Sequence, residues 1–230
     1  MTSAVSVGAS TVPVHGTGPG PSPRTALQRI GVRPIPKRVA KELLEREHYL
    51  HSLPGGTKLC FGAFVENRLL GALTLGVGPF EAHSLVEGAH RDDCVTLTRL
   101  WLSDDLPHNS ESRVIGVVMR ALRRHTSIRF VLSYADPEMG HIGVIYQATG
   151  WLYTGLSQAT PLYDLGDGRA RHGRTLGHSF GTHSVEYLKS CGVPIRLVPR
   201  GSKHRYLHAI DPDIVVRITV PVLRYPQKER

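Results

Sequence analysis

The stretch from Arg129 to Gly155, which reads RFVLSYADPEMGHIGVIYQATGWLYTG, constrains the fold of this chain more than any other. Its apolar opening predicts a strand, and Pro137 marks the end of that strand because proline disfavours helix at the preceding Asp136. Helical spacing over 142–149 predicts a short helix that Gly150 ends, and an aromatic strand follows. We therefore expect Asp136 at the mouth of a sheet, where open α/β sheets bind ligands.

The segments before this stretch alternate between helical and strand-like patterns. We expect a helix from about Pro36 to Glu47, antiparallel strands over 58–66 and 69–76, a strand over 95–102 and a helix over 114–124. Taken together, the elements predict an α/β fold with a mixed central sheet flanked by helices.

Composition divides the chain into three parts. Residues 1–25 are small and polar with many Gly and Pro, and we expect them to be disordered because they bury too little apolar area. Residues 26–165 form the expected catalytic core. Residues 166–230 are rich in His and Arg, and we expect a basic extension that packs on the core. The elements expected within it are a helix over 184–190, a strand over 194–199 and a final strand over 215–222.

The balance of 28 Lys and Arg against 19 Asp and Glu gives a formal charge of +9, which favours an anionic partner such as nucleic acid. A basic protein without a nucleic-acid role is the alternative. The three cysteines are odd in number and lack CxxC spacing, so we expect neither a disulfide framework nor a cysteine zinc site. No apolar stretch is long enough to cross a bilayer, and we expect a cytoplasmic protein without a membrane partner.

Two further places carry side chains that suit a functional site. His48 and Tyr49 follow the first predicted helix, and Arg99 lies on a strand rich in large apolar residues, where a guanidinium needs a partner. Each candidate has a structural alternative. Asp136 is also typical of a turn, His48 suits a helix C-terminus, and Arg99 is also explained as an ion-pair partner of Asp136 or Glu138.

The order of the predicted elements resembles the acyltransferase fold of the GCN5-related N-acetyltransferase superfamily. The resemblance implies that the strand–loop–helix step, here residues 101–122, binds the coenzyme A pyrophosphate through backbone amides at the helix start. The loop LPHNSESR lacks the glycines usual in that superfamily, so the donor is either acetyl-coenzyme A or another small acyl or glycine-derived compound. The expected cofactor contacts are Asn109, Ser110, Ser112 and Arg113.

The series YADP, GH, IYQA and YTG, together with the upstream pair His48 and Tyr49 and with Arg99, resembles the phage Mom DNA-modification proteins. The resemblance covers about residues 35–165, with a weaker match at the segment KHRY. It implies an enzyme that adds a carbamoylmethyl group to N6 of adenine in double-stranded DNA, which protects phage DNA from restriction. The basic extension is then expected to contact DNA phosphates.

This second resemblance also implies roles for individual residues. The expected catalytic residues are Ser133, Tyr146, Asp136 and Arg99. Family members are associated with a bound iron, and the matching ligands are His48, Tyr49 and Asp136. A base inside a duplex is out of reach, so we expect base flipping against an aromatic wall. Candidates for the wall, each of which also suits a core position, are Tyr49, Trp101, Tyr134, Tyr146 and Trp151.

Two other functions fit the same sequence. One is a conventional acyl-coenzyme A dependent N-acetyltransferase of a small amine or peptide, which predicts saturable coenzyme A binding. The other is a DNA-binding phage accessory protein that keeps the fold without catalysis, for which Asp136→Ala would change no activity. The sequence leaves the oligomeric state open.

Overall fold

The computed structural model describes residues 29–227, apart from the side chains of residues 172 and 174. The expected disordered tail over 1–25 lies outside the described residues. Seven strands form a central sheet, and they are β1 (Gly31–Pro34), β2 (Thr57–Val65), β3 (Arg68–Gly76), β4 (Cys94–Leu102), β5 (Phe130–Ala135), β6 (Leu152–Leu156) and β10 (His204–Ala209). Their order is β1-β2-β3-β4-β5-β10-β6, and neighbouring strands are antiparallel except β4 and β5, which run parallel.

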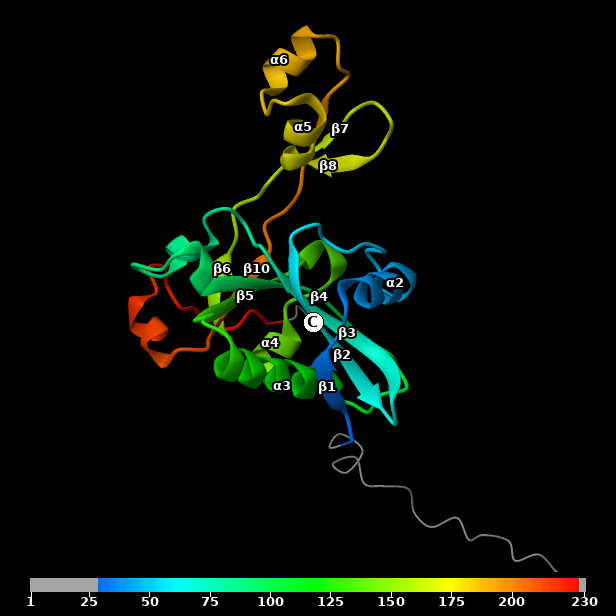
Figure 1. Ribbon diagram of the computed structural model, residues 1–230. Helices are drawn as coiled ribbons and strands as arrows, with labels where there is room; N and C mark the ends of the chain where they lie inside the picture. Colours follow the sequence, from blue (N-terminus) through cyan, green and yellow to red (C-terminus); the bar gives the residue numbers. More distant parts are fainter. Residues whose placement is uncertain (1–28, 228–230) are drawn as a thin grey trace, which may run out of the picture.

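Helices α2 (Lys37–Glu47) and α3 (Ser110–His125) cover opposite faces of this sheet (Figure 1). The apolar side of α3 packs in one cluster with Leu73, whereas Leu43 and Leu44 of α2 pack against the neighbouring Ala72. Successive residues of a strand point to opposite faces, so the two helices lie on opposite sides. The predicted α/β fold with a mixed central sheet flanked by helices is confirmed.

Short elements complete the core. They are the short helix α4 (Val144–Ala148) and the 3-10 turns η1 (Ala82–Leu85), η2 (Arg91–Asp93), η3 (Pro137–Met139) and η4 (Pro212–Arg217). The expected final strand over 215–222 is wrong, because Pro212 begins the 3-10 turn η4 and the following chain makes only the isolated bridges of Ile218 and Leu223. Ile214 of η4 instead packs into a cluster with Phe130 of β5.

The parallel strands β4 and β5 separate towards their carboxyl ends, and we call the gap in their backbone pairing the opening. Backbone pairing joins Cys94–Thr96 to Phe130–Leu132 and then stops. Beyond this point β4 pairs only with β3, and β5 pairs with β10. Asp136 follows β5 directly, so it lies beside the opening, at the sheet edge where the sequence predicts it.

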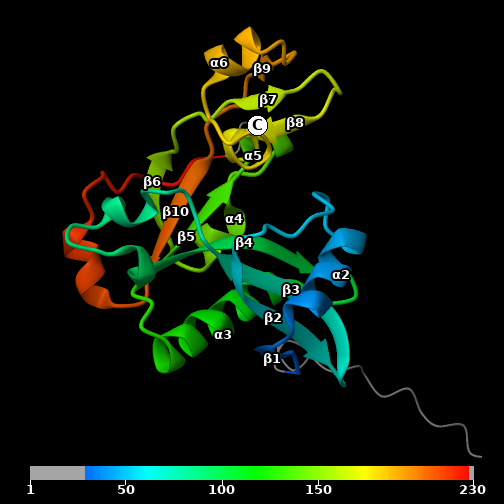
Figure 2. The ribbon, with the colours of Figure 1, turned by 45° about the horizontal axis from the view of Figure 1, so that its top comes forward.

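A second, smaller unit is inserted between β6 and β10, and we call residues 162–198 the projecting module. Its elements are β7 (Leu162–Asp164), β8 (Ala170–His172), α5 (Gly173–Phe180), α6 (Val185–Ser190) and β9 (Arg196–Val198). The three strands form their own sheet, and Leu176, Leu188 and Ile195 form a separate apolar cluster. Both ribbon views show the module standing away from the central sheet (Figure 1, Figure 2).

The position of the projecting module in the chain differs from the domain boundary expected from the sequence. We expected a boundary between residues 165 and 166, yet β10 comes from the expected extension and lies inside the central sheet between β5 and β6. The segment that stands apart is therefore internal, and the chain returns to the core after it. No helix in the described part of the chain has the length and apolar character needed to span a membrane.

Candidate active site

The chain after α2 meets the connection between β5 and α4. His48 ends α2 and is buried, whereas the next residue, Tyr49, is 49% exposed. The ring of Tyr49 stacks on His48 with 4.5 Å between centroids and lies 6.0 Å from the ring of His141. The end of α2 thus contacts the β5–α4 connection through the rings of Tyr49 and His141, whereas the side chain of Asp136 pairs with Arg200 and Lys203.

Arg99 lies in the part of β4 that has separated from β5. Its guanidinium donates to Ser52 O at 3.0 Å, to Ser52 Oγ at 3.2 Å and to Thr98 O at 2.7 Å. Within residues 29–227 no carboxylate forms an ion pair with it, so the alternative pairing with Asp136 or Glu138 is wrong. A half-buried guanidinium held only by neutral acceptors keeps its charge available for an anion.

His48 presents a hydrogen-bond donor to this site. Burial and the neighbouring Arg99 lower the pKa of His48 to about 4, so its ring is neutral at pH 7. Its Nδ1 accepts the backbone N–H of Leu50 at 3.1 Å. A neutral imidazole that accepts at Nδ1 carries its proton at Nε2, and this N–H is the group that His48 can offer to a ligand.

Asp136 begins η3 and is 9% exposed. Its Oδ1 accepts the N–H of Glu138 at 3.1 Å, and its Oδ2 accepts from Arg200 at 3.1 Å and Lys203 at 2.7 Å. Burial raises the pKa of Asp136, but the hydrogen bonds and charges of Lys203 and Arg200 outweigh burial and lower this pKa below its ordinary value. Lys203 begins the segment KHRY, the weaker part of the resemblance, whereas only its charge distinguishes Arg200 in the sequence.

Ser133 and Tyr146 lie beneath the opening. Ser133 is buried on β5 and its Oγ donates to Leu97 O of β4 at 3.3 Å. Burial raises the pKa of Tyr146 to about 12 despite a hydrogen bond with Ser133, so the phenol stays protonated at neutral pH. Trp151 is fully buried in the core, whereas Tyr49 is exposed. Tyr146 is buried and Trp101 and Tyr134 are half-buried, so Tyr49 is the most exposed ring of the expected aromatic wall.

The residues expected to hold iron do not fit that role in this arrangement. The carboxylate of Asp136 already binds two cationic side chains, which would repel a metal ion. A metal-bound histidine normally donates from its second ring nitrogen, whereas Nδ1 of His48 accepts a hydrogen bond. Residues 29–227 contain no group of three His, Cys, Asp or Glu side chains that could hold a metal.

The four expected cofactor contacts lie at the start of α3. The hydroxyl of Ser110 donates to the carbonyl of Pro107, and Asn109 adopts a left-handed backbone with φ of 70° without capping the helix through its side chain. Ser112 is half-buried. Nε of Arg113 is buried and has no hydrogen-bond partner among the described residues. A buried donor without a partner is destabilising, so Arg113 is the member of this set best suited to a ligand.

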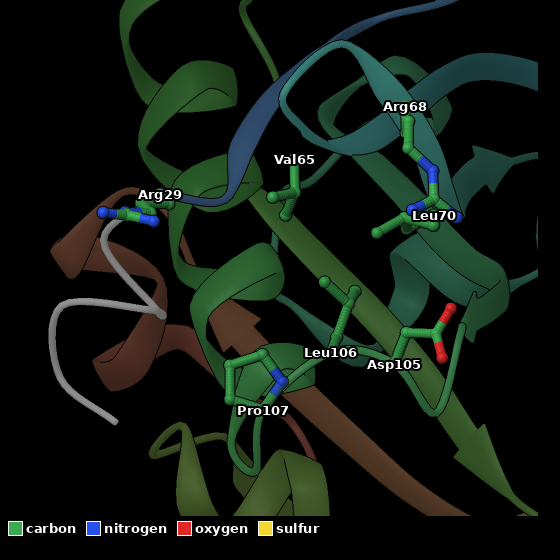
Figure 3. A pocket seen from close by; sticks show the side chains of 7 residues that line it. All are labelled: Arg29, Val65, Arg68, Leu70, Asp105, Leu106 and Pro107. Atoms are coloured by element: carbon green, nitrogen blue, oxygen red, sulfur yellow. The ribbon is translucent and has the colours of Figure 1, made fainter. Parts of the chain in front are cut away.

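A cavity of about 400 Å³ lies between the β2–β3 hairpin and the loop before α3 (Figure 3). The residues that line it are Arg29, Val65, Arg68, Leu70, Asp105, Leu106 and Pro107. None of them is a predicted site residue, although Asp105, Leu106 and Pro107 belong to the step over 101–122 that was expected to bind the donor. His48, Tyr49 and Arg99 do not line this cavity.

Solved structures with a remote likeness are acetyltransferases. One is a GNAT family N-acetyltransferase, YhbS, from Escherichia coli in complex with CoA, with a TM-score of 0.46, 14% identity and coverage of 84% of this chain and 87% of that one. Another is a probable acetyltransferase from Staphylococcus epidermidis, with a TM-score of 0.44, 10% identity and coverage of 78% and 98%.

The sequence comparisons are more specific. The chain is 32% identical over 141 residues to methylcarbamoylase Mom of Escherichia phage Mu, which is 60% of this chain and 58% of the phage protein. It therefore spans less than two thirds of that relative. The family model of the Mom protein family matches residues 29–227. Because this match spans most of the 230-residue chain, the chain belongs to the Mom protein family.

Proposed function

We propose that this protein modifies adenine in double-stranded DNA by transferring a carbamoylmethyl group to the exocyclic N6. The observation that carries the proposal is the family match over 29–227, which takes in every residue of the candidate site. The relative from phage Mu is named a methylcarbamoylase. The formal charge of +9 supports a polyanionic substrate. A modification of this kind would protect DNA from restriction enzymes that read adenine.

The proposed reaction forms a bond between N6 and the methylene carbon of the donor, and it releases one N6 proton and the donor's leaving group. The adenine amine is a weak nucleophile because its lone pair is delocalised into the ring. A base in a duplex is also inaccessible, so the target adenine must flip out of the stack. Tyr49 supports this step, because its exposed ring lies against His48 at the mouth of the site and offers a face for stacking.

The polar groups of the site would serve the transfer in different ways. Arg99 has no carboxylate partner among the described residues, so its charge would stabilise negative charge that develops on the donor. His48 and Tyr146 would donate hydrogen bonds, since the first carries its proton at Nε2 and the second keeps its phenol protonated. In this proposal Asp136 accepts the N6 proton.

We propose that the donor carries its leaving group on the methylene carbon, as a glycine-derived compound can, and that it binds near the start of α3. The buried Nε of Arg113, which lacks a partner in the described part of the chain, supports this position.

Nucleoside mass spectrometry of DNA from cells that express the protein tests the proposal. Wild type is expected to yield a modified deoxyadenosine, and Arg99→Gln is expected to lower its amount by about 100-fold, the usual effect of removing one group that stabilises developing charge. Arg120→Gln is the matched control, because Arg120 lies exposed on α3. Unmodified deoxyadenosine in cells with folded wild-type protein would contradict the proposal.

A further inference from the structure

Two segments connect the projecting module to the core, 157–161 and 199–203, and they are held together at their base. The N–H of Ser157 donates to Lys203 O at 2.8 Å, and the N–H of Lys203 donates to Ser157 Oγ at 3.1 Å. The segment 199–203 continues into β10, which pairs with β5. The returning segment therefore runs beside the turn that carries Asp136.

Two basic side chains of this returning segment share one carboxylate oxygen. Arg200 lies 3.1 Å and Lys203 2.7 Å from Oδ2 of Asp136. The side chains of Arg200 and Lys203 are 23% and 26% exposed, so solvent reaches both, whereas that of Asp136 is only 11% exposed. Two cations on a single carboxylate leave positive charge that a further anion can satisfy.

The nearby carboxylate of Glu138 does not pair with these side chains. It accepts the backbone N–H of Gly201 at 2.6 Å and so holds the segment by its main chain. The sequence 196–205, RLVPRGSKHR, carries three Arg, one Lys and one His and no acidic residue. The segment therefore stays attached to the core when Arg200 and Lys203 exchange one anion for another.

A DNA phosphate is the anion that this place best accommodates. It carries the charge of a carboxylate, and Arg and Lys are its usual protein partners. The backbone carbonyl of Asp136 accepts the N–H of His141 at 3.0 Å, and the ring of His141 lies 6.0 Å from that of Tyr49. Arg200 and Lys203 are thus connected, through Asp136 and His141, to the ring expected to stack on the extruded base, and the phosphates of the flipped nucleotide must pass near that ring.

We propose that Arg200 and Lys203 bind phosphates of the DNA substrate and that Asp136 takes the place of phosphate while DNA is absent. The inference rests on the proposed function, because it takes DNA as the substrate. Binding of DNA then draws both side chains away from Asp136. If the ion pairs only anchored the returning segment, removing the charge of Asp136 would loosen that segment and bring no gain in DNA affinity.

The chain contains a matched control for Asp136. Asp211 also precedes a proline, begins a 3-10 turn, accepts the N–H of the second following residue and pairs with an arginine, Arg129, at 2.7 Å. Asp211→Asn therefore makes the same charge change in the same local motif without touching Arg200 or Lys203. It separates a specific competition from a general effect of net charge.

Fluorescence anisotropy of the full chain with a labelled DNA duplex, titrated at several salt concentrations, tests the inference. Arg200→Gln and Lys203→Gln are each expected to weaken binding and to reduce the slope of log affinity against log salt by about 0.9, the value for one lost phosphate contact. Asp136→Asn is expected to tighten binding several-fold, whereas Asp211→Asn has a much smaller effect. In the Arg200→Gln/Lys203→Gln background, the gain from Asp136→Asn should disappear.

Thermal melts establish that each variant is folded, and Arg200→Lys should recover part of the salt slope. Unchanged slopes for both glutamine variants, or an Asp136→Asn variant that binds no tighter than Asp211→Asn, would overturn the inference and leave the proposed function standing. Wild type that binds DNA without modifying it would overturn the proposed function alone. A wild type that does not bind DNA would overturn both.

Discussion

At the scale of single residues, the environment of Arg99 sets the chemistry of the site. Its guanidinium is half-buried and held by Ser52 and Thr98, all through neutral acceptors. Its charge acts on His48, which burial already disfavours in the protonated form. A strand arginine that needs a partner was visible in the sequence, but its actual partner, the chain after α2, was not.

Arg99→Gln is expected to raise the pKa of His48 from about 4. Removing a cation lowers the free energy of the protonated imidazole, so the pKa must move up. Burial is the larger cause of the shift and persists in the variant, so the pKa should stay below the ordinary value of 6.5. An NMR titration of the imidazole measures this change, with Arg120→Gln as control. An unchanged pKa in Arg99→Gln would show that the guanidinium does not act on His48.

At the scale of elements, the connection from β5 to α4 is shaped by two glycines with left-handed backbones. Gly140 ends η3 with φ of 70°, and Gly143 precedes α4 with φ of 80°. A Cβ on Gly143 would lie 2.7 Å from Cζ of Tyr206, whereas one on Gly140 would meet nothing within 4 Å. The hydroxyl of Tyr206 donates to Ile142 O, so this close approach fixes the connection to β10.

Gly143→Ala is expected to destabilise the protein clearly more than Gly140→Ala. A left-handed backbone costs an alanine about 1–2 kcal/mol at either position. Only at Gly143 is there an added steric cost against Tyr206, typically about 1–3 kcal/mol for an overfilled site. Urea unfolding of the two variants measures the difference. Equal losses of unfolding free energy would mean that the contact with Tyr206 does not fix this connection.

The sequence predicted the elements whose pattern is local. Apolar spacing gave α2, α3 and β2 to β5, and Pro137 placed Asp136 at the end of its strand. β10 was not predicted because its sequence HRYLHA has no regular apolar alternation, and because its position between β5 and β6 depends on contacts made after the projecting module. The prediction of a strand over 215–222 is wrong because Pro212 starts a 3-10 turn. This turn includes Val215 and Val216, whose β-branched side chains favour a strand.

The candidate site was also predictable only in part. His48, Tyr49 and Arg99 came from the sequence, and the structure gathers them with His141. The pairing of Arg200 and Lys203 with Asp136 was not predicted, because these contacts span more than 60 positions of sequence and require the module to fold between them.

At the scale of the whole molecule, several histidines are held in their neutral form. Burial lowers the pKa of His208, and its ring lies 5.3 Å from that of Trp151. Burial likewise lowers the pKa of His204 and of His48. In the unfolded chain these groups take up protons near pH 6.5, so the unfolded state gains protons before the folded state does. The contribution of these histidines to the free energy of unfolding is therefore fully present above pH 6.5. It declines as the pH falls below 6.5 and is lost once the pH has passed through the folded-state pKa values.

His208→Phe is expected to make the protein less sensitive to acid. Phenylalanine keeps a ring against Trp151 but has no proton to gain, so one contribution to the acid loss disappears. The measurement is the difference in Tm between pH 7.5 and pH 5, which should be smaller in the variant than in wild type. An identical difference would contradict the burial of a neutral His208. His125→Phe serves as control, because His125 lies exposed at the end of α3.

The central claim, that the site joined by α2, β4 and the β5–α4 connection transfers a carbamoylmethyl group to adenine N6, is tested most directly on the product. Tandem mass spectrometry of nucleosides from DNA treated with wild-type protein locates the added group and distinguishes its mass from that of an acetyl group. We predict a single new deoxyadenosine derivative with the carbamoylmethyl group on N6. An acetyl adduct, a group on another base or ring atom, or DNA that is bound but unmodified would contradict the claim.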